Sequence, residues 1–374
     1  MLQDRIDVLN QGDENGNDTI AKITLATGRV ILAFATKNLY AGDWDFGPTW
    51  NYFVEAERPF LVDTGRRGMG PRLMEMMDRA GVELADLGFV LLSHGHEDHD
   101  GGLFELTQAS SLDIKAHETY RLLNRTASIE APLTHLAHYP ASCWRCPMPE
   151  SFSQKHCVEY HHERATLKTT SVGEGDSGLG AGISVMHVPG HNPDCVALLI
   201  DEEVMLTGDT ILPEITTHPT TEDCFRFTRS LLPSRYTDAG QLYGLRAYIR
   251  SVKRLREISR NHPHLGVLPA HRLFSNAAWN LLDLRARCDE LIQHHIDRCA
   301  AILAVVDSQP RTPKEIAEEH FEPRLLAGFG IHMAVNEVVS HCELLDHCGD
   351  AVWADGRLIA TGNRGFESFI RNLV

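Results

Sequence analysis

Short apolar runs that end in polar residues alternate with amphipathic stretches through most of the chain. The segments 23–37 and 50–65 have the pattern of β-strands, whereas residues 71–82 have the spacing of one helical face. Further apolar runs that predict strands are 89–93, 113–117, 183–191, 195–201, 203–209 and 265–271, and further helical patterns are 103–110 and 241–259. Strands that alternate with helices are typical of a layered α/β fold.

The pattern changes near residue 277, where a long amphipathic helix is predicted. Its apolar positions are Leu284, Cys288, Leu291, Cys299, Ile302 and Val306. Two shorter helical patterns, 312–321 and 332–345, come next, and Asp355–Gly356 then marks a two-residue hairpin between short strands. We therefore expect a first domain over residues 1–285 and a second unit over 286–374, in which the long helix leads into a helical, winged-helix-like module.

The composition is that of an ordinary globular protein, with 43% hydrophobic and 23% charged residues among 374. The chain carries 35 basic and 51 acidic residues, a formal charge of −16, and such a field repels nucleic acids and anionic membranes. Neither a signal peptide nor an apolar run of about 18 residues is visible, so the cytoplasm is the expected location. The nine cysteines are then expected to be reduced thiols.

Ligand-type side chains are concentrated in GFVLLSHGHEDHDGGL, residues 88–103, where a buried strand gives way to a turn. His94 and His96 stand two residues apart on an extended segment and so point the same way. Asp98 and His99 follow where the chain turns toward the next helix. Neutral imidazoles and carboxylates are ligands that zinc and similar divalent metals prefer, so the cluster predicts a metal site.

Four other apolar strands each end in a residue of the same kind. These residues are Asp63 in VDTG, His191 in VPGH, Asp209 in TGDT and His271 in PAH. Because strand ends in an α/β fold meet at one edge of the sheet, we expect these side chains to converge with the histidine cluster. The sequence therefore predicts one active site assembled from several separate strands.

In these motifs the sequence resembles the metallo-β-lactamase superfamily, whose five motifs occur in order from Asp63 to His271. The resemblance implies an αββα sandwich with a two-metal site at one edge. The implied ligands are His94, His96 and His191 for the first metal, Asp98, His99 and His271 for the second metal, and Asp209 as the bridge. Asp63 is implied to lie behind the ligands and to orient a ligand imidazole.

The resemblance implies a hydrolase with two zinc ions, for which iron or manganese could also serve, and a bridging hydroxide as the nucleophile. Asp98 and Asp209 are the implied catalytic carboxylates, and Asp98 would also accept a hydrogen bond from the nucleophile. Ser93 is interpreted as a strand-end residue. True β-lactamases usually carry a cysteine where Asp209 stands, which argues against antibiotic hydrolysis. Within the superfamily the sequence is similar to the glyoxalase II type of thioesterase and to the related branch with a winged-helix tail, which implies a small acyl thioester or ester as the substrate. A single-strand endoribonuclease and an iron-dependent oxidoreductase similar to the persulfide dioxygenases are the alternatives.

The segment 118–171 is expected to form a lid or an insertion within the first domain. Its ligand-type residues Cys143, Cys146, Cys157 and His161 have a spacing that could hold a structural zinc ion. The alternative is that the cysteines pack as small apolar residues.

Three further residues are candidates for substrate contacts. Trp144 and Tyr160 belong to the same segment and would suit the wall of an apolar substrate pocket. Packing within the segment is the alternative for both. Arg272 follows the ligand His271 directly and could contact an anionic group of a substrate, or else form a surface salt bridge.

The second unit is expected to serve packing or a homodimer contact rather than nucleic-acid recognition. Its second helix offers the acidic residues Glu337, Glu343, Asp346 and Asp350 and no lysine or arginine, whereas phosphate recognition requires positive charge. The expected partner is a small-molecule substrate, with neither a nucleic acid nor a membrane.

Overall fold

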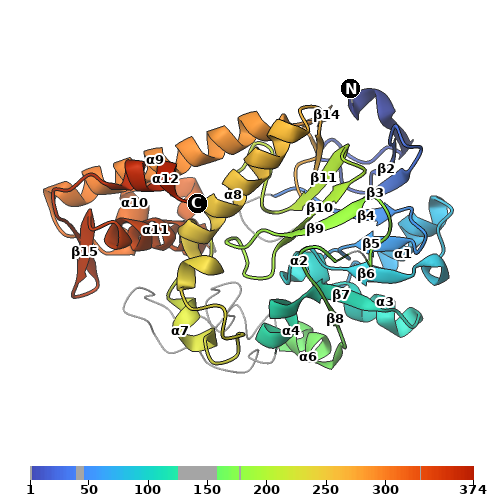
Figure 1. Cartoon of the computed structure of the whole chain (residues 1–374), viewed down its shortest axis with the longest axis horizontal. Coiled ribbons are helices and arrows are strands. Elements are labelled where there is room, and N and C mark those ends of the chain that lie inside the picture. The colour runs from blue at the N-terminus through green and yellow to red at the C-terminus, as the bar shows by residue number, and fades with distance from the viewer. Residues whose placement is uncertain (1, 39–45, 125–157, 177, 329) are drawn as a thin grey trace.

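Two β-sheets face each other at the centre of the computed structural model, which describes residues 2–38, 46–124, 158–176, 178–328 and 330–374 (Figure 1). The first sheet contains β1 (Ile6–Asn10), β2 (Ile20–Thr24), β3 (Val30–Thr36), β4 (Thr49–Val54), β5 (Phe60–Val62), β6 (Phe89–Leu91), β7 (Ile114–His117) and β8 (Thr170–Val172), in that order. Its strands pair antiparallel from β1 to β5 and parallel from β5 to β8.

The second sheet has the order β12-β11-β10-β9. Its strands are β9 (Ile183–His187), β10 (Val196–Ile200), β11 (Val204–Gly208) and β12 (Gly266–Pro269). Apolar side chains from both sheets, among them Phe60 and Leu91 from the first and Leu198 and Leu206 from the second, form one buried core between them. Strands buried on both faces read as nearly continuous apolar runs, which is why they stand out in the sequence.

Helices cover the outer faces of both sheets. On the first sheet α1 (Gly70–Arg79) and α3 (Leu103–Ala109) bury Leu73, Met76 and Leu106. On the second sheet α8 (Gly244–Asn261) and α9 (Leu284–Ser308) lie side by side. The predicted αββα arrangement is therefore confirmed.

Shorter helices lie before or between the main elements along the chain. They are α2 (Glu97–Asp100), α4 (Glu118–Asn124), α6 (Val158–Thr166), α7 (Cys224–Thr228) and the 3₁₀ helices Leu2–Arg5, Leu84–Asp86, Ala239–Gln241 and Pro323–Leu326. Within the described residues, no helix has the length and apolar character needed to cross a membrane.

Local turns shift two boundaries from their predicted places. The segment 23–37 forms the end of β2 and the whole of β3, joined by a turn in which Gly28 has a φ of +90°. The long helix begins at Leu284 rather than near 277, because a small hairpin of β13 (Phe274–Ser275) and β14 (Ala278–Trp279) comes first. Asp283 then caps α9 by accepting a hydrogen bond from the Ala286 amide.

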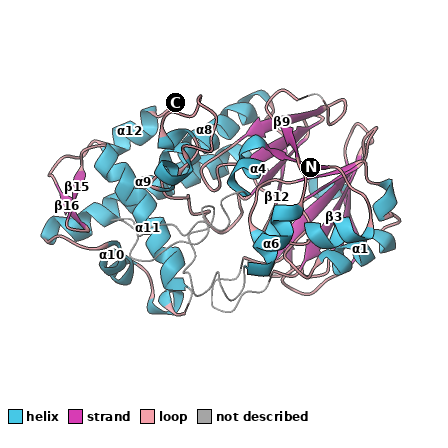
Figure 2. Cartoon of the chain, turned by 90° about the horizontal axis from the view of Figure 1, so that it is seen from below, coloured by secondary structure: helices cyan, strands magenta, loops and turns pink. Residues whose placement is uncertain are grey.

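The C-terminal elements follow the predicted order of two helices and a hairpin (Figure 2). They are α10 (Pro313–His320), α11 (Gly330–His347), β15 (Ala351–Ala354), β16 (Arg357–Ala360) and a final helix α12 (Phe366–Asn372). Asp355 and Gly356 have φ values of +49° and +73°, as a two-residue hairpin turn of type I′ requires.

The core of the second sheet continues into the C-terminal helices. Buried side chains of β9 to β12, α8 and α9 form one cluster with those of α10, α11 and α12. The carboxylate of Glu343 on α11 also accepts hydrogen bonds from the amides of Glu222 and Asp223, at 2.8 and 3.1 Å, just before α7. The C-terminal helices are therefore built onto the second sheet, and the division at residue 285 stays a prediction.

Two buried histidines face each other where α9 packs on α11. His341 Nδ1 lies 2.6 Å from the carbonyl oxygen of Glu337, which can only accept, so this nitrogen carries the proton. His341 Nε2 must then accept from His295 Nδ1, 3.0 Å away. Burial is the main reason why the pKa of His341 falls to about 4, and the pKa of His295 also lies well below its usual value.

Acid should weaken this helix junction. Because the folded-state pKa of His341 lies below the unfolded value, the unfolded chain takes up a proton first, and stability falls as the pH drops from about 6.5 toward 4. Wild type should lose about 2 kcal/mol more than His341→Gln between pH 6.5 and 4.5. Denaturant unfolding at both pH values measures this difference, and parallel losses in the two proteins would contradict it.

Candidate active site

The predicted ligand residues lie together at one edge of the sandwich. Asp63 follows β5, His94 follows β6, His191 follows β9, Asp209 follows β11 and His271 follows β12. All seven predicted ligands belong to three overlapping groups of side chains, each compact enough to hold a metal ion. The convergence that the sequence predicts is therefore found in the structure.

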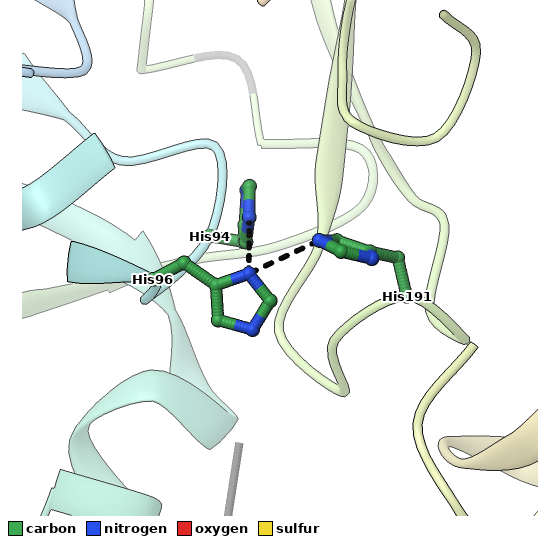
Figure 3. A group of neighbouring side chains, drawn as sticks. All are labelled: His94, His96 and His191. Atoms are coloured by element: carbon green, nitrogen blue, oxygen red, sulfur yellow. Dashed lines mark hydrogen bonds between the residues drawn. The ribbon is translucent and has the colours of Figure 1, made fainter. Parts of the chain in front are cut away.

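The first group consists of His94, His96 and His191 (Figure 3). His96 Nδ1 lies 3.0 Å from His94 Nε2 and 3.0 Å from His191 Nε2, so one nitrogen of each ring points to a shared position. Burial, followed by the nearby His99 and His96, lowers the pKa of His94 well below its usual value. This imidazole is therefore neutral, as a metal ligand must be.

The second group consists of Asp98, His99 and His271. His271 Nε2 lies 3.3 Å from an Asp98 oxygen, and His99 Nε2 lies 3.7 Å from the other. Asp209 stands between the two groups, with one oxygen 3.4 Å from His191 Nε2 and 3.5 Å from His99 Nε2, and the other 3.5 Å from His271 Nε2. Asp209 is thus placed where a bridging ligand would be.

Backbone carbonyls fix the orientation of two ligand imidazoles. His191 Nδ1 lies 3.0 Å from the carbonyl oxygen of His218, and His271 Nδ1 lies 3.1 Å from that of Pro48. A carbonyl only accepts, so each Nδ1 carries the proton and each Nε2 keeps a free lone pair. Both rings therefore present the nitrogen that a metal needs to the centre of the site.

Asp63 is hydrogen-bonded to the ligand His99 and to Ser93. One of its oxygens accepts from the Ser93 hydroxyl at 2.6 Å and from His99 Nδ1 at 2.9 Å, and the other accepts from the Ser93 amide at 2.7 Å. The Ser93 oxygen is left to accept from His94 Nδ1, 3.1 Å away. Ser93 is therefore more than a strand-end residue, because it connects Asp63 to a ligand of the other group.

The carboxylates make the site favourable for positive charge. Burial opposes protonation of His99, yet the charges of Asp209, Asp98 and Asp63 raise its pKa well above the usual value. Burial likewise opposes ionisation of Asp209, yet His271 and His99 hold the pKa of its carboxyl well below the usual range. A divalent cation would take the place of these protons.

The donor set and two buried atoms fit a metal centre. His99 Nε2 and Asp209 Oδ1 are buried and form no hydrogen bond within the described part of the chain. Buried polar atoms are normally paired, so each such atom requires an explanation. Two groups of imidazole nitrogens and carboxylate oxygens are a suitable ligand set for zinc, iron or manganese, so the residues fit two metal ions.

The two glycines that follow the histidine cluster allow close backbone contact. A Cβ on Gly101 would lie 2.1 Å from the Glu97 carbonyl oxygen and 2.3 Å from the Arg67 amide nitrogen. A Cβ on Gly102 would lie 2.4 Å from the Thr64 carbonyl oxygen. Any side chain there would push the ligand segment away from the loop after β5.

Polar contacts around Asp98 and Asp209 give no signal in the sequence. Asn38 is 3% exposed and donates a hydrogen bond of 2.8 Å from Nδ2 to an Asp98 oxygen. The Thr217 hydroxyl donates to the carbonyl oxygen of Asp209. Because Asn38 is 60 residues from Asp98 along the chain, only the folded arrangement reveals the contact.

Loss of the Asp63 carboxylate should weaken metal binding. In Asp63→Asn one carboxylate oxygen is replaced by an NH2 group, which cannot accept a hydrogen bond from His99 Nδ1 or from Ser93, so the His99 ring loses its fixed orientation. Zinc affinity should fall about 10- to 100-fold, as is usual when such a supporting residue is lost. Competition with a chelator measures this, with Asp113→Asn on the exposed surface as the matched control, and equal affinities would count against the assigned role.

The residues proposed for a structural zinc ion mostly lie outside the described part of the chain. Cys143, Cys146, Cys157 and Trp144 fall within residues 125–157, and their predicted roles stay predictions. His161 lies on α6, where its Nδ1 is 3.2 Å from Arg164 Nη2. The cysteines that the structure describes, at positions 195, 224, 288, 299, 342 and 348, are free thiols.

The structure gives Tyr160 a different place from the predicted one. Tyr160 is 4% exposed, and its hydroxyl donates a hydrogen bond of 2.5 Å to Asp100, so its side chain packs behind the ligand segment instead of lining a substrate wall. Arg272 adopts a left-handed backbone with a φ of +59°, and its side chain lies beside Gly47. A substrate contact by Arg272 stays a prediction.

Residues 44–258 match the Metallo-beta-lactamase superfamily. That match covers more than half of the chain and includes six of the seven predicted metal ligands. The chain therefore belongs to this superfamily.

Curated relatives cover part of the chain. A beta-lactamase-like protein 2 homolog of Drosophila melanogaster is 28% identical over 176 residues, which are 46% of this chain and 49% of that protein. The chain thus spans about half the length of this relative. An N-acyl homoserine lactonase from Bacillus sp is 27% identical over 214 residues, which are 49% of this chain and 72% of the lactonase.

Solved structures resemble the chain over more of its length. A metallo-beta-lactamase family protein from Thermus thermophilus has a TM-score of 0.63 at 20% identity, covering 88% of this chain and 98% of that one. A beta-lactamase domain protein from Burkholderia ambifaria has the same TM-score at 18% identity, covering 94% and 97%. At these identities the likeness concerns the fold, and it extends into the C-terminal helices.

Proposed function

We propose that this chain is a metal-dependent hydrolase that cleaves a small acyl substrate, an ester or a thioester, at a site for two metal ions. The observation that carries the proposal is the meeting of two ligand groups at Asp209. His94, His96 and His191 would hold one metal ion, and Asp98, His99 and His271 the other. Zinc is the proposed metal, with iron or manganese as the other metals that this ligand set accepts.

Two divalent metal ions bound there would supply an activated water as nucleophile and would polarise the carbonyl oxygen of the substrate. Asp98 is aimed by Asn38, whose Nδ2 holds one carboxylate oxygen at 2.8 Å. That leaves the carboxylate able to accept a hydrogen bond from the attacking water. Asp209 reaches both ligand groups, so its carboxylate would be shared by the two metal ions.

The proposed substrate class draws on the relatives. A lactone is a cyclic ester, and a lactonase 27% identical to this chain matches over about half of it. Esters, lactones and thioesters share a carbonyl carbon that water attacks and a leaving oxygen or sulfur. The acyl group itself would be selected by residues around the site.

The C-terminal helices support a small-molecule substrate rather than a nucleic acid. Residues 333–345 of α11 are all buried, so this helix is packed inside the protein and cannot lie in a groove of DNA or RNA. The helix carries no lysine or arginine, and the whole chain has a formal charge of −16. We propose that the winged-helix-like elements serve packing on the second sheet.

A panel of substrates tests this proposal. Zinc-loaded protein is assayed against acyl thioesters, linear esters, N-acyl homoserine lactones, phosphodiesters and single-stranded RNA, with Asp209→Ala alongside. Hydrolysis of an ester or thioester that is lost in the variant supports the proposal. RNA cleavage that is lost in the variant would replace it with a nuclease, and oxygen consumption with a persulfide by the iron-loaded protein would replace it with an oxidoreductase.

A further inference from the structure

A buried carboxylate directly follows the ligand His99. Asp100 is 2% exposed, and both of its oxygens accept hydrogen bonds from tyrosines. The Tyr160 hydroxyl donates to Oδ1 at 2.5 Å, and the Tyr120 hydroxyl donates to Oδ2 at 2.8 Å. Neither tyrosine is more than 4% exposed, so the arrangement is closed off from solvent.

Arg164 connects this carboxylate to the other end of the ligand segment. Its Nη1 lies 3.5 Å from Asp100 Oδ2 and donates to the Tyr160 hydroxyl at 2.6 Å. The same nitrogen donates at 3.2 Å to the carbonyl oxygen of Gly95, the residue between His94 and His96. One guanidinium therefore contacts the segment both between two ligand histidines and just after the third.

The contact between Arg164 and the ligand segment joins parts of the chain that are far apart in sequence. Tyr160 and Arg164 are one helical turn apart on α6, and their side chains stack, with the guanidinium 4.7 Å from the ring centroid. Arg164 is 69 residues from Gly95 along the chain. Helix α6 belongs to the segment that the sequence predicts to be an insertion, yet it packs directly behind the ligands.

Burial of a charged pair gives little stability by itself, because removing both charges from water offsets most of their attraction. An apolar packing of similar volume would hold the helix as well. The polar contacts differ from apolar packing because hydrogen bonds are directional. Contacts from Arg164 to the Gly95 carbonyl and the Asp100 carboxylate therefore fix the backbone between these two residues. A small displacement there would move the ligand nitrogens out of place.

We propose that Arg164, Tyr160 and Asp100 are positioning residues, which set the backbone at Gly95 and thereby aim His94 and His96 at the metal. This inference rests on the proposed metal site. It gives α6 a role in shaping the first coordination sphere without touching substrate.

The test is zinc affinity, measured by chelator competition on the full chain. Arg164→Gln removes the contact to Gly95, and Tyr160→Phe removes one hydroxyl while leaving the charges in place. We expect affinity to fall about 10- to 100-fold in the first variant and less in the second. In both variants the turnover number kcat should fall, whereas KM should change little. Arg164→Lys, which keeps the charge without the planar fork, should lie between Arg164→Gln and wild type.

Glu163→Gln is the matched control on the same helix. The Glu163 side chain pairs with Arg67 at 2.7 Å rather than with Asp100, Tyr160 or the Arg164 guanidinium, so its replacement should leave zinc affinity unchanged. If zinc affinity in Arg164→Gln and Tyr160→Phe equals that of the control while only the melting temperature falls, the residues are structural and the inference is wrong. If wild type itself binds no zinc, the proposed function fails and this inference fails with it.

Discussion

Replacement of Asp209 by alanine should reduce kcat/KM by at least about 1000-fold, which corresponds to about 4 kcal/mol of lost transition-state stabilisation. Asp209 is the side chain that reaches both ligand groups, with oxygens 3.4 to 3.5 Å from His191, His99 and His271. Without it, the site would lose the ligand that its two halves share. Metal content should therefore fall together with activity.

Steady-state kinetics on the substrate found with the panel measures this effect. Asp113→Ala is the control, because Asp113 forms an ion pair with Arg58 in which both side chains are more than half exposed. That variant should keep the activity of wild type. Wild-type turnover in Asp209→Ala would show that the bridging role is wrong, whatever the metal content.

Removal of residues 308–374 should leave a protein that aggregates. The deletion takes away α10, α11 and α12, which share one core with the second sheet. Buried apolar residues of α11 that would be lost include Val335, Val338, Val339, Leu344 and Leu345. At about 1.5–3 kcal/mol for each side chain, their loss alone is on the order of 10 kcal/mol, which is comparable to the net stability of a whole domain.

Size-exclusion chromatography and thermal unfolding measure the result of the truncation. Val352→Ser is a suitable control, because Val352 is 44% exposed on the C-terminal hairpin and is not part of the buried core. It should behave as wild type does. A truncated chain that remains monomeric and melts cooperatively near the wild-type temperature would show that the rest of the chain folds without the C-terminal helices, contrary to the prediction.

The metal ligands are predictable from the sequence because each of them interrupts or ends an apolar run. His94, Asp209 and His271 each follow a strand whose residues are almost all buried, and His191 follows β9, in which three of the five residues are buried. The change from apolar to ligand-type residue is therefore visible in the sequence. Asp63 has the same signature, and only the family resemblance places it behind the ligands. The local sequence pattern is therefore sufficient to predict which residues form the site. The structure adds how their side chains are oriented.

Residues that act through long-range contacts are not predictable in this way. Asn38 and Arg164 have ordinary sequence surroundings, and they contact the ligand segment at Asp98 and Gly95, which are 60 and 69 residues away. Asp100 lies inside the histidine cluster, but its partner Tyr160 is 60 residues away. The sequence suggests a substrate contact for Tyr160 because aromatic residues in an insertion often line pockets, whereas its hydroxyl is held by Asp100. Ser93 has the sequence surroundings of a strand end, and nothing local indicates that its hydroxyl donates a hydrogen bond to Asp63.

For the C-terminal helices, too, the elements are predictable from the sequence but their packing is not. The two helices and the hairpin are predictable because the Asp355–Gly356 turn and the helical spacing are local signals. How these helices pack is not evident from the sequence. Helix α11 is apolar on more than one face, and the elements that pack on each face are not identified by any local sequence signal. In the structure those faces meet α8, α9 and α10.

Metal analysis by mass spectrometry tests the central claim most directly. Purified wild type and a His94→Ala, His271→Ala double variant are both loaded with zinc and freed of excess metal. One ligand is lost from each of the two groups, so wild type should hold about two metal equivalents per chain more than the variant. A difference of one equivalent or none, not raised by further zinc, would contradict a two-metal site.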